Sequence, residues 1–108
     1  LLMDLGSCQW DDGLLALLGV PRNVLPAIVD CAGGLASTEL LGRPVPITGA
    51  AGDQQAAAIG QACLAPGMLK ATYGTGCFLL AHAGPVPPRS RNRLLATVAW
   101  RLNGAPAY

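Results

Sequence analysis

Two glycine-rich segments contain the side chains in this sequence that could do chemistry. The first is the run GAAGDQQ at residues 49–55, which lies between an expected strand and an expected helix. Ligands in α/β proteins bind at the carboxyl ends of strands, next to the N-termini of helices. At that junction Asp53 could accept a proton from a bound hydroxyl group, and Gln54 could hydrogen-bond a neighbouring hydroxyl. An aspartate N-cap, followed by glutamines on a solvated first turn, fits the same residues.

The second segment is the run YGTGC at residues 73–77. The glycines Gly74 and Gly76 would let the backbone approach a phosphate closely, and the Thr75 hydroxyl could donate to a phosphate oxygen. An ordinary hairpin turn, whose glycines supply positive φ, also fits this run. The run is neither a P-loop nor a dinucleotide-binding fingerprint, because no G-K-[ST] and no G-x-G-x-x-G pattern accompanies it.

The first third of the chain is expected to be helical. An aspartate N-cap in the run WDD at residues 10–12 opens a short apolar helix over residues 14–18, which Gly19 and Pro21 end. Pro21 can stand in the first turn of a second short helix from Arg22 to Val29, where its missing N–H costs nothing. The glycine pair at residues 33–34 is expected to break this pattern and to begin a loop that runs through Thr38.

A strand, a helix and a hairpin are expected to position the two segments. Residues 44–48 should be extended, and their prolines favour an edge strand or a strand entry. Residues 56–63 are rich in alanine and favour a helix, in which Gly60 suggests close packing against a neighbour. Beyond the turn at Pro66, two strands over 68–73 and 77–81 are predicted to form a β-hairpin around the second segment.

The domain organisation is predicted from the change of texture at Pro66. We expect residues 1–66 to complete one domain and residues 67–108 to begin a second, with a further strand over 94–100. The pair Asn103-Gly104 is a hairpin-turn dipeptide with only one expected strand before it. We therefore expect the chain to be an internal piece that stops before the return strand.

The composition points in the same direction. Charged residues make up 12% of the 108 residues, hydrophobic residues 52%, and the mean hydropathy is +0.43. A soluble domain usually carries about 25% charged residues. A chain this small has a large surface relative to its volume, so a low charge content predicts that much of its surface is buried against something else.

Several classes of function are disfavoured by the same numbers. The apolar stretch Leu14–Val20 is far shorter than the roughly 20 residues that span a bilayer. The net charge of +1 gives no attraction to nucleic acid. The one basic cluster is expected to be a solvated loop, with a phosphate or acidic-partner site as the alternative; its members are Arg89, Arg91 and Arg93. The four cysteines are widely spaced and His82 is the single histidine, so no metal site is expected. Buried, reduced cysteines in a cytoplasmic protein fit better.

Taken together, the two segments resemble the glycerol kinases of the FGGY carbohydrate kinase family. The resemblance is carried by GDQQAA at 52–57, GQ at 60–61, GM at 67–68, Lys70 and TYGTGCF at 72–78. The flanks agree: they are WDD at 10–12, PR at 21–22, LP at 25–26, Asn92, and LLATVAW at 94–100. The resemblance covers essentially the whole chain, and its central block is highly specific.

This resemblance implies an α/β fold, as part of a kinase with two actin/hexokinase/RNase H-like domains and ATP in the cleft between them. It implies that Asp53 is the general base, that Gln54 contacts glycerol, and that Phe78 packs against the glycerol carbon chain. The turn, with Gly74, Thr75 and Gly76, would contact the nucleotide phosphates, and Mg²⁺ would offset their charge. The full-length enzyme would be a cytoplasmic homo-oligomer, a dimer or tetramer, while the 108 residues alone would be inactive.

Three alternatives stay open on the sequence. A kinase of the same family that acts on xylulose, gluconate or ribulose would share the fold and the aspartate, although Gln54, Gln55 and Phe78 favour glycerol. A non-catalytic nucleotide-binding relative of the actin or chaperone kind would bind ATP without polyol-dependent turnover. A degenerate reading frame is the third alternative, and the flanking coding sequence would distinguish it.

Overall fold

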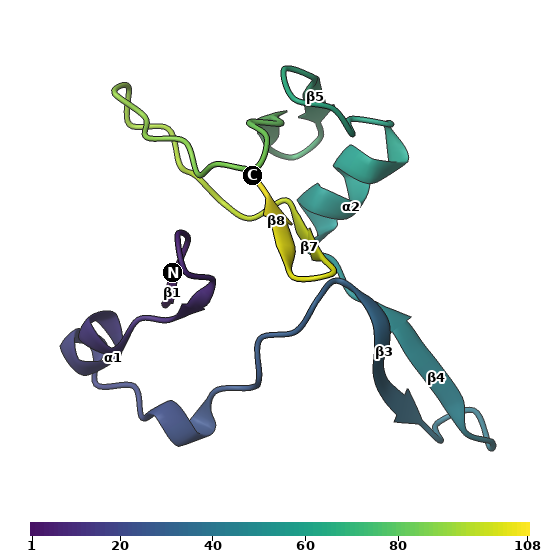
Figure 1. Cartoon of the computed structure of the whole chain (residues 1–108). Coiled ribbons are helices and arrows are strands. Elements are labelled where there is room, and N and C mark those ends of the chain that lie inside the picture. The colour runs from purple at the N-terminus through teal and green to yellow at the C-terminus, as the bar shows by residue number, and fades with distance from the viewer.

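The computed structural model describes residues 1–108 as a set of four separate β-hairpins with two short α-helices (Figure 1). Each sheet has two antiparallel strands, and no strand joins two hairpins. The strands are β1 Met3–Asp4, β2 Gln9–Trp10, β3 Ala32–Thr38, β4 Val45–Gly49, β5 Leu69–Tyr73, β6 Cys77–Ala81, β7 Trp100–Leu102 and β8 Ala105–Ala107. The helices are α1 Asp12–Leu18 and α2 Asp53–Gly60, with a 3₁₀ turn η1 at Arg22–Val24. The chain is thus a mixture of helix and strand, as expected for an α/β protein.

The chain has almost no core of its own. Only 8 of 108 residues are buried, and leucines such as Leu17, Leu40 and Leu95 are exposed. The radius of gyration is 15.9 Å, whereas a compact chain of this length has about 13 Å. The accessible surface is 7965 Å², against roughly 5,600 Å² for a compact monomer of this mass. This open shape agrees with the prediction, made from the low charge content, that much apolar surface needs a cover.

The first predicted helix is confirmed at both ends. Asp11 is the N-cap of α1, and its Oδ1 accepts a hydrogen bond from the Leu14 backbone N–H at 2.9 Å. Gly19 ends the helix in the left-handed conformation with φ 64°, which glycine adopts without steric cost. No helix of the chain is long and apolar enough to cross a membrane.

The second predicted helix, Arg22 to Val29, is wrong beyond its first turn. Only η1 forms, and Leu25 already has an extended backbone with φ −90° and ψ 139°. Leu25 precedes Pro26, whose ring disfavours the helical conformation in the residue before it. Pro21 therefore permits a helix to begin, but Pro26 ends it after one turn.

The loop predicted to begin at the glycine pair is a strand instead. β3 pairs with β4, with Thr38 opposite Val45, and the register shifts between Ala32 and Ala36. Gly33, with φ 131°, lies inside this irregularity. Glycine in a strand commonly marks a bulge, so here it bends the ladder without ending it. The extended segment predicted at residues 44–48 is confirmed as β4.

The C-terminal part differs from two predictions. The segment 94–99 is irregular, and the strand begins only at Trp100. Asn103 and Gly104 form the predicted turn with φ 52° and 76°, and a return strand, β8, pairs Ala105 with Leu102. The expectation that the return strand is missing is therefore wrong. The turn fixes which residues can pair, and only three residues on each side do so.

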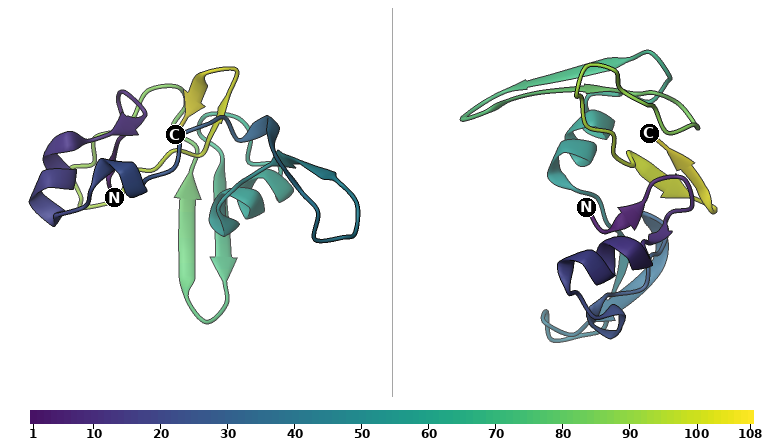
Figure 2. Two further views of the ribbon diagram at one scale, coloured as in Figure 1. Left: turned by 90° about the horizontal axis from the view of Figure 1, so that it is seen from below. Right: turned by 90° about the vertical axis from the view of Figure 1, so that its left-hand side faces the viewer.

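The two elements of most interest are close to their predicted positions. α2 begins at Asp53, three residues before the predicted start, and ends at Gly60. A Cβ added to Gly60 would meet no atom within 4 Å, so the expected close packing at this glycine is not found. The predicted hairpin is confirmed as β5 and β6, which extend away from the rest of the chain (Figure 2). The expectation of buried cysteines is confirmed for Cys8 and Cys63. Cys31 is only half-buried, and Cys77, near the tip of this hairpin, is exposed, so the expectation is wrong for Cys77.

Candidate functional site

Asp53 is the first residue of α2, and its carboxylate is open to solvent. Gly52 is the N-cap, and it provides no side-chain hydrogen bond. The interpretation of Asp53 as a capping aspartate is therefore wrong. Its Oδ1 accepts one hydrogen bond, from the Gln54 backbone N–H at 2.8 Å. Because a carboxylate can accept about four hydrogen bonds, most of the capacity of Asp53 is free for a ligand.

Gln54 is held by a residue for which we predicted no role. Its Oε1 accepts a hydrogen bond from Lys70 Nζ at 2.5 Å, which connects the first turn of α2 to β5. Lys70 is the most buried large side chain of the chain, at 1% exposed. One signal in the sequence could have identified Lys70, because it is the only lysine and lies within the run that carries the family resemblance.

Gln55 is used inside the chain. Its Nε2 donates to the Val98 carbonyl oxygen at 3.4 Å, and its Oε1 lies where a Cβ on Gly52 would come within 2.7 Å. Gly52 has φ −65°, which any residue could adopt. A side chain at position 52 would therefore require the Gln55 amide to move, whereas the backbone conformation at this position does not require glycine.

The register of the β5–β6 hairpin places Phe78 on the same face as Lys70. Phe78 is opposite Thr72 and Lys70 is opposite Leu80, and directly opposite residues of an antiparallel pair share a face, as do residues two apart. The burial agrees with this register, because Lys70 is buried and Thr72 and Leu80 are half-buried on this face. The residues on the other face are exposed: Leu69, Ala71, Tyr73, Cys77 and Leu79. Because Lys70 contacts Gln54, the face that carries Phe78 is the one directed to the start of α2.

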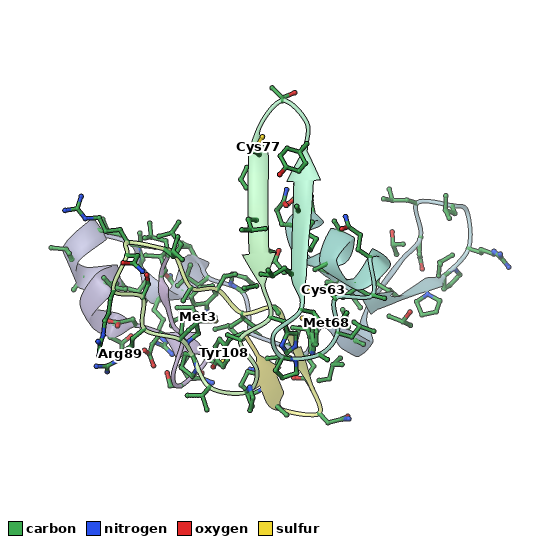
Figure 3. The ribbon with its side chains drawn as sticks, turned by 90° about the horizontal axis from the view of Figure 1, so that it is seen from above. Met3, Cys63, Met68, Cys77, Arg89 and Tyr108 are labelled. Atoms are coloured by element: carbon green, nitrogen blue, oxygen red, sulfur yellow. The ribbon has the colours of Figure 1, made fainter.

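The turn at the tip of this hairpin does not need its glycines for backbone conformation. Neither Gly74 nor Gly76 has positive φ, so the interpretation of an ordinary glycine turn is wrong on that point. Gly74 N–H donates to the Gly76 carbonyl at 3.0 Å, while the Thr75 and Gly76 N–H groups form no hydrogen bond within the chain. A Cβ at Gly76 would come within 3.1 Å of the Phe78 ring. Thr75 is exposed between the glycines. Cys77, two residues later in the chain, is labelled near the far end of the hairpin in Figure 3.

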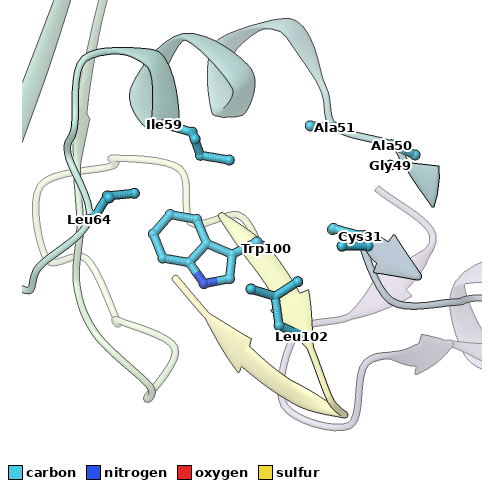
Figure 4. A pocket seen from close by; sticks show the side chains of 9 residues that line it. Cys31, Gly49, Ala50, Ala51, Ile59, Leu64, Trp100 and Leu102 are labelled. Carbon is cyan, nitrogen blue, oxygen red and sulfur yellow. The ribbon is translucent and has the colours of Figure 1, made fainter.

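An apolar cavity lies in the chain, and none of these residues lines it. It has a volume of about 480 Å³, and Figure 4 shows the Trp100 ring beneath Ile59 and Leu64. Its lining is almost entirely apolar: Cys31, Ala32, Gly49, Ala50, Ala51, Ile59, Leu64, Trp100 and Leu102. A second cavity shares Cys31, Ala50 and Ala51 with the first and is also lined by Gly52 and Gln55. An apolar lining can bury a hydrophobic group, but it offers no proton acceptor for chemistry.

Two contacts distant in sequence hold the C-terminal hairpin in place. Asp30 accepts from Arg101 Nε at 2.6 Å and from the Gly104 N–H at 2.9 Å. The Gly104 hydrogen bond and then the Arg101 guanidinium hold the pKa of Asp30 below its usual value. His82 is buried against Trp100, with ring centroids 5.0 Å apart; its Nδ1 accepts from the Gly84 N–H, while its Nε2 is buried without a partner. We predicted no role for Asp30, and we did not predict the contact between His82 and Trp100.

The sequence-predicted residues are thus brought together in part. Lys70 bonds the Gln54 side chain and shares a face of the β5–β6 hairpin with Phe78, and Asp53 precedes Gln54 on α2. Thr75 lies at the hairpin tip and makes no contact with Asp53 within the chain. No group of three or more potential metal ligands occurs among histidine, cysteine, aspartate and glutamate. A Mg²⁺ ion carried by nucleotide phosphates needs few ligands from the protein, because phosphate oxygens and water molecules supply most of its coordination.

Comparison with known proteins gives a consistent result. Residues 1–60 match the N-terminal domain of the FGGY family of carbohydrate kinases. A glycerol kinase from Xanthobacter autotrophicus is 53% identical over 110 aligned positions, glycerol kinase 1 of Pseudomonas aeruginosa is also 53% identical, and a glycerol kinase from Aromatoleum aromaticum is 54% identical. Each alignment covers all of this chain but only 22% of the relative, so the chain spans about a fifth of the length of these proteins.

Proposed function

The chain belongs to the FGGY family of carbohydrate kinases, and from that premise we propose that it carries the proton acceptor of an ATP-dependent glycerol kinase. In this proposal the full-length protein transfers the γ-phosphoryl group of ATP to a terminal hydroxyl of glycerol and releases glycerol 3-phosphate. The relatives of about 53% identity are named glycerol kinases, which supports glycerol over other polyols. The 108 residues alone would not catalyse the reaction, because they span only 22% of those relatives.

One observation supports this proposal above the others: a free carboxylate begins α2 beside an amide that is held in place. Asp53 uses its Oδ1 only for the Gln54 N–H, and the Gln54 side chain is tied to Lys70. Asp53 would accept the proton of the attacking hydroxyl as its oxygen forms the bond to phosphorus. Phosphoryl transfer asks for little covalent chemistry from the protein, so the positioning of such groups contributes most.

Glycerol has a short carbon chain between its hydroxyls, and Phe78 would cover it. The ring of Phe78 is 52% exposed and lies on the hairpin face that carries Lys70. An exposed aromatic ring on the hairpin face whose Lys70 bonds the Gln54 amide would provide an apolar wall, which a small polyol site needs beside its polar groups. Phe78 would therefore favour the carbon backbone of the substrate while Asp53 and Gln54 bind its hydroxyls.

The nucleotide phosphates would bind the turn at residues 74–76. The Thr75 hydroxyl, the Thr75 N–H and the Gly76 N–H have no partner within the chain, and backbone N–H groups in a turn can bind phosphate oxygens. Gly74 has no steric need to be glycine, since a Cβ there would meet only the Gly76 oxygen at 4.0 Å. Close approach of a ligand is a reason for glycine at that position. Mg²⁺ would supply charge neutralisation on the phosphates.

We also propose the wider organisation that the resemblance implies. The full-length protein would have two actin/hexokinase-like domains, with a boundary near Pro66 and ATP and Mg²⁺ between the domains. It would be a cytoplasmic homo-oligomer, a dimer or tetramer. The open shape supports this in one respect, because apolar side chains such as Leu79 and Leu95 would be covered by further protein.

The test is ATP consumption by the longest natural chain that contains these residues, with glycerol, xylulose, gluconate and ribulose supplied in parallel. We expect turnover on glycerol with the highest kcat/KM. A higher kcat/KM on another substrate would replace glycerol by that polyol within the same family. ATP binding by a folded protein with no turnover on any polyol would contradict the enzyme assignment and favour a non-catalytic nucleotide-binding relative.

A further inference from the structure

We infer that Lys70 is a positioning residue that fixes which end of the Gln54 amide faces the substrate, an inference that rests on the polyol kinase function proposed above. Lys70 Nζ donates to Gln54 Oε1 at 2.5 Å, and Lys70 is 1% exposed. No carboxylate neutralises it, since the two ion pairs of the chain are Arg22–Asp12 and Arg101–Asp30. The amide of Gln54 is therefore the one polar partner of a buried ammonium group.

The chemistry of the ammonium group determines the orientation of the amide. Lysine has three N–H donors and no acceptor, whereas an amide presents an oxygen that accepts at one end and an NH₂ group that donates at the other. Only the oxygen of Gln54 can face Lys70. The NH₂ group must then face away from it, and Gln54 offers a donor to whatever binds on that side.

This orientation complements the carboxylate next to it. Asp53 is an acceptor when ionised, and Gln54 held by Lys70 is a donor. Adjacent hydroxyls of a polyol can fit both groups at once, because one hydroxyl donates to Asp53 while the next accepts from Gln54. Without Lys70 the amide could rotate by half a turn and present its oxygen, which cannot donate to the second hydroxyl.

The strand that carries Lys70 keeps the ammonium group in place. Lys70 is the second residue of β5 and is paired with Leu80. Thr72, on the same face, has a buried Oγ1 without a hydrogen-bond partner. The contact with Gln54 is therefore made from a paired strand and not from a mobile loop. It also links the start of α2 to the hairpin whose turn, residues 74–76, is the proposed phosphate site.

The experiment compares Lys70→Met with wild type in the full-length protein, by steady-state kinetics with glycerol and with ATP varied separately. Methionine keeps much of the length and removes the donors. We expect the KM for glycerol to rise about five- to tenfold, as for the loss of one oriented hydrogen bond. The KM for ATP should change by less than about twofold, and Lys70→Arg should recover part of the loss because it retains a donor. Arg91→Met, which removes an exposed cation elsewhere, is the matched control.

Two further variants separate orientation from stability. Gln54→Glu keeps an acceptor for Lys70 as an ion pair but has no donor, so the melting temperature should not fall while the KM for glycerol rises at least as much as in Lys70→Met. In a Gln54→Ala background, Lys70→Met should cause no further rise, because the two residues act through one contact.

The outcomes distinguish this inference from the proposed function. If wild type phosphorylates glycerol and neither Lys70→Met nor Gln54→Glu raises the KM for glycerol beyond twofold, Lys70 has no positioning role and the kinase assignment stands. An equal rise in the Gln54→Ala background would also overturn the inference. If Lys70→Met does not fold, Gln54→Glu decides the question alone. If wild type uses no polyol, the function and the inference that rests on it fall together.

Discussion

Replacing Asp53 by asparagine separates the role of this residue in catalysis from its role in the helix. The asparagine oxygen can still accept the Gln54 N–H bond, which Asp53 Oδ1 now accepts at 2.8 Å. The helix loses only a negative charge at its exposed first residue, which costs about 0.3–1 kcal/mol. Loss of the proton acceptor should lower kcat by at least ~100-fold, or about 2.7 kcal/mol in the activation free energy. The expected loss in catalysis therefore exceeds the loss in stability several-fold.

The assay is ATP consumption at saturating glycerol, with a thermal melt of the same preparation. Asp12→Asn is the control, because Asp12 is likewise the exposed first residue of a helix, α1, although it also loses an ion pair with Arg22. We expect this control to retain its kcat. A kcat of Asp53→Asn within a few-fold of wild type would refute the role of Asp53 as general base. A fall in kcat that follows a similar fall in melting temperature would assign the effect to folding instead.

Three further predictions follow from particular contacts. Gly74→Ala should raise the KM for ATP, because its Cβ has room within the chain and would hinder only a bound phosphate. Gly76→Ala should act mainly on the KM for glycerol, because its Cβ would displace the Phe78 ring. Equal effects on both constants in both variants would contradict this division. The pKa of Asp30 is lowered by the Gly104 hydrogen bond and then by Arg101, so its contribution to stability is present above the ordinary value of 3.8 and is lost as the pH falls through the lowered pKa. The protection of the Gly104 amide against hydrogen exchange, relative to its intrinsic rate at the same pH, should therefore fall there, and Asp30→Asn should remove that pH dependence. Burial, and then the hydrogen bond with Cys8, raises the pKa of Tyr108, so its contact with the N-terminal hairpin is present below pH 10 and is lost as the pH rises through the raised value; a phenolate absorbance titration that shows an unshifted Tyr108 would contradict this.

Local sequence signals predicted the elements that local chemistry determines. The N-cap at Asp11, the stop at Gly19 and the turn at Asn103-Gly104 were all readable because each depends on a residue and its near neighbours. The hairpin around residues 74–76 was readable for the same reason. Asp53 and Gln54 were singled out by the change from strand to helix that occurs between β4 and α2.

The errors occurred where a distant or competing contact decides the structure. β3 forms because β4 pairs with it, and no local feature of the glycine pair predicted this. The run at 94–99 has strand-like residues but finds no partner strand, so its pattern is not used. Lys70 was quoted as part of a pattern, but its role depends on contact with Gln54, 16 residues away. Burial of a charged side chain cannot be predicted from its type, because lysine is usually exposed.

The contact between Tyr108 and Leu5 has a consequence for the order in which the chain assembles. The Tyr108 hydroxyl donates to the Leu5 carbonyl oxygen across 103 residues, whereas each of the four hairpins closes over a short connection. Hairpins form in about 1–10 μs, and synthesis adds only about 5–20 residues per second. Each hairpin can thus close as soon as it is made, but the β1–β2 hairpin has to wait several seconds for the tyrosine that anchors it.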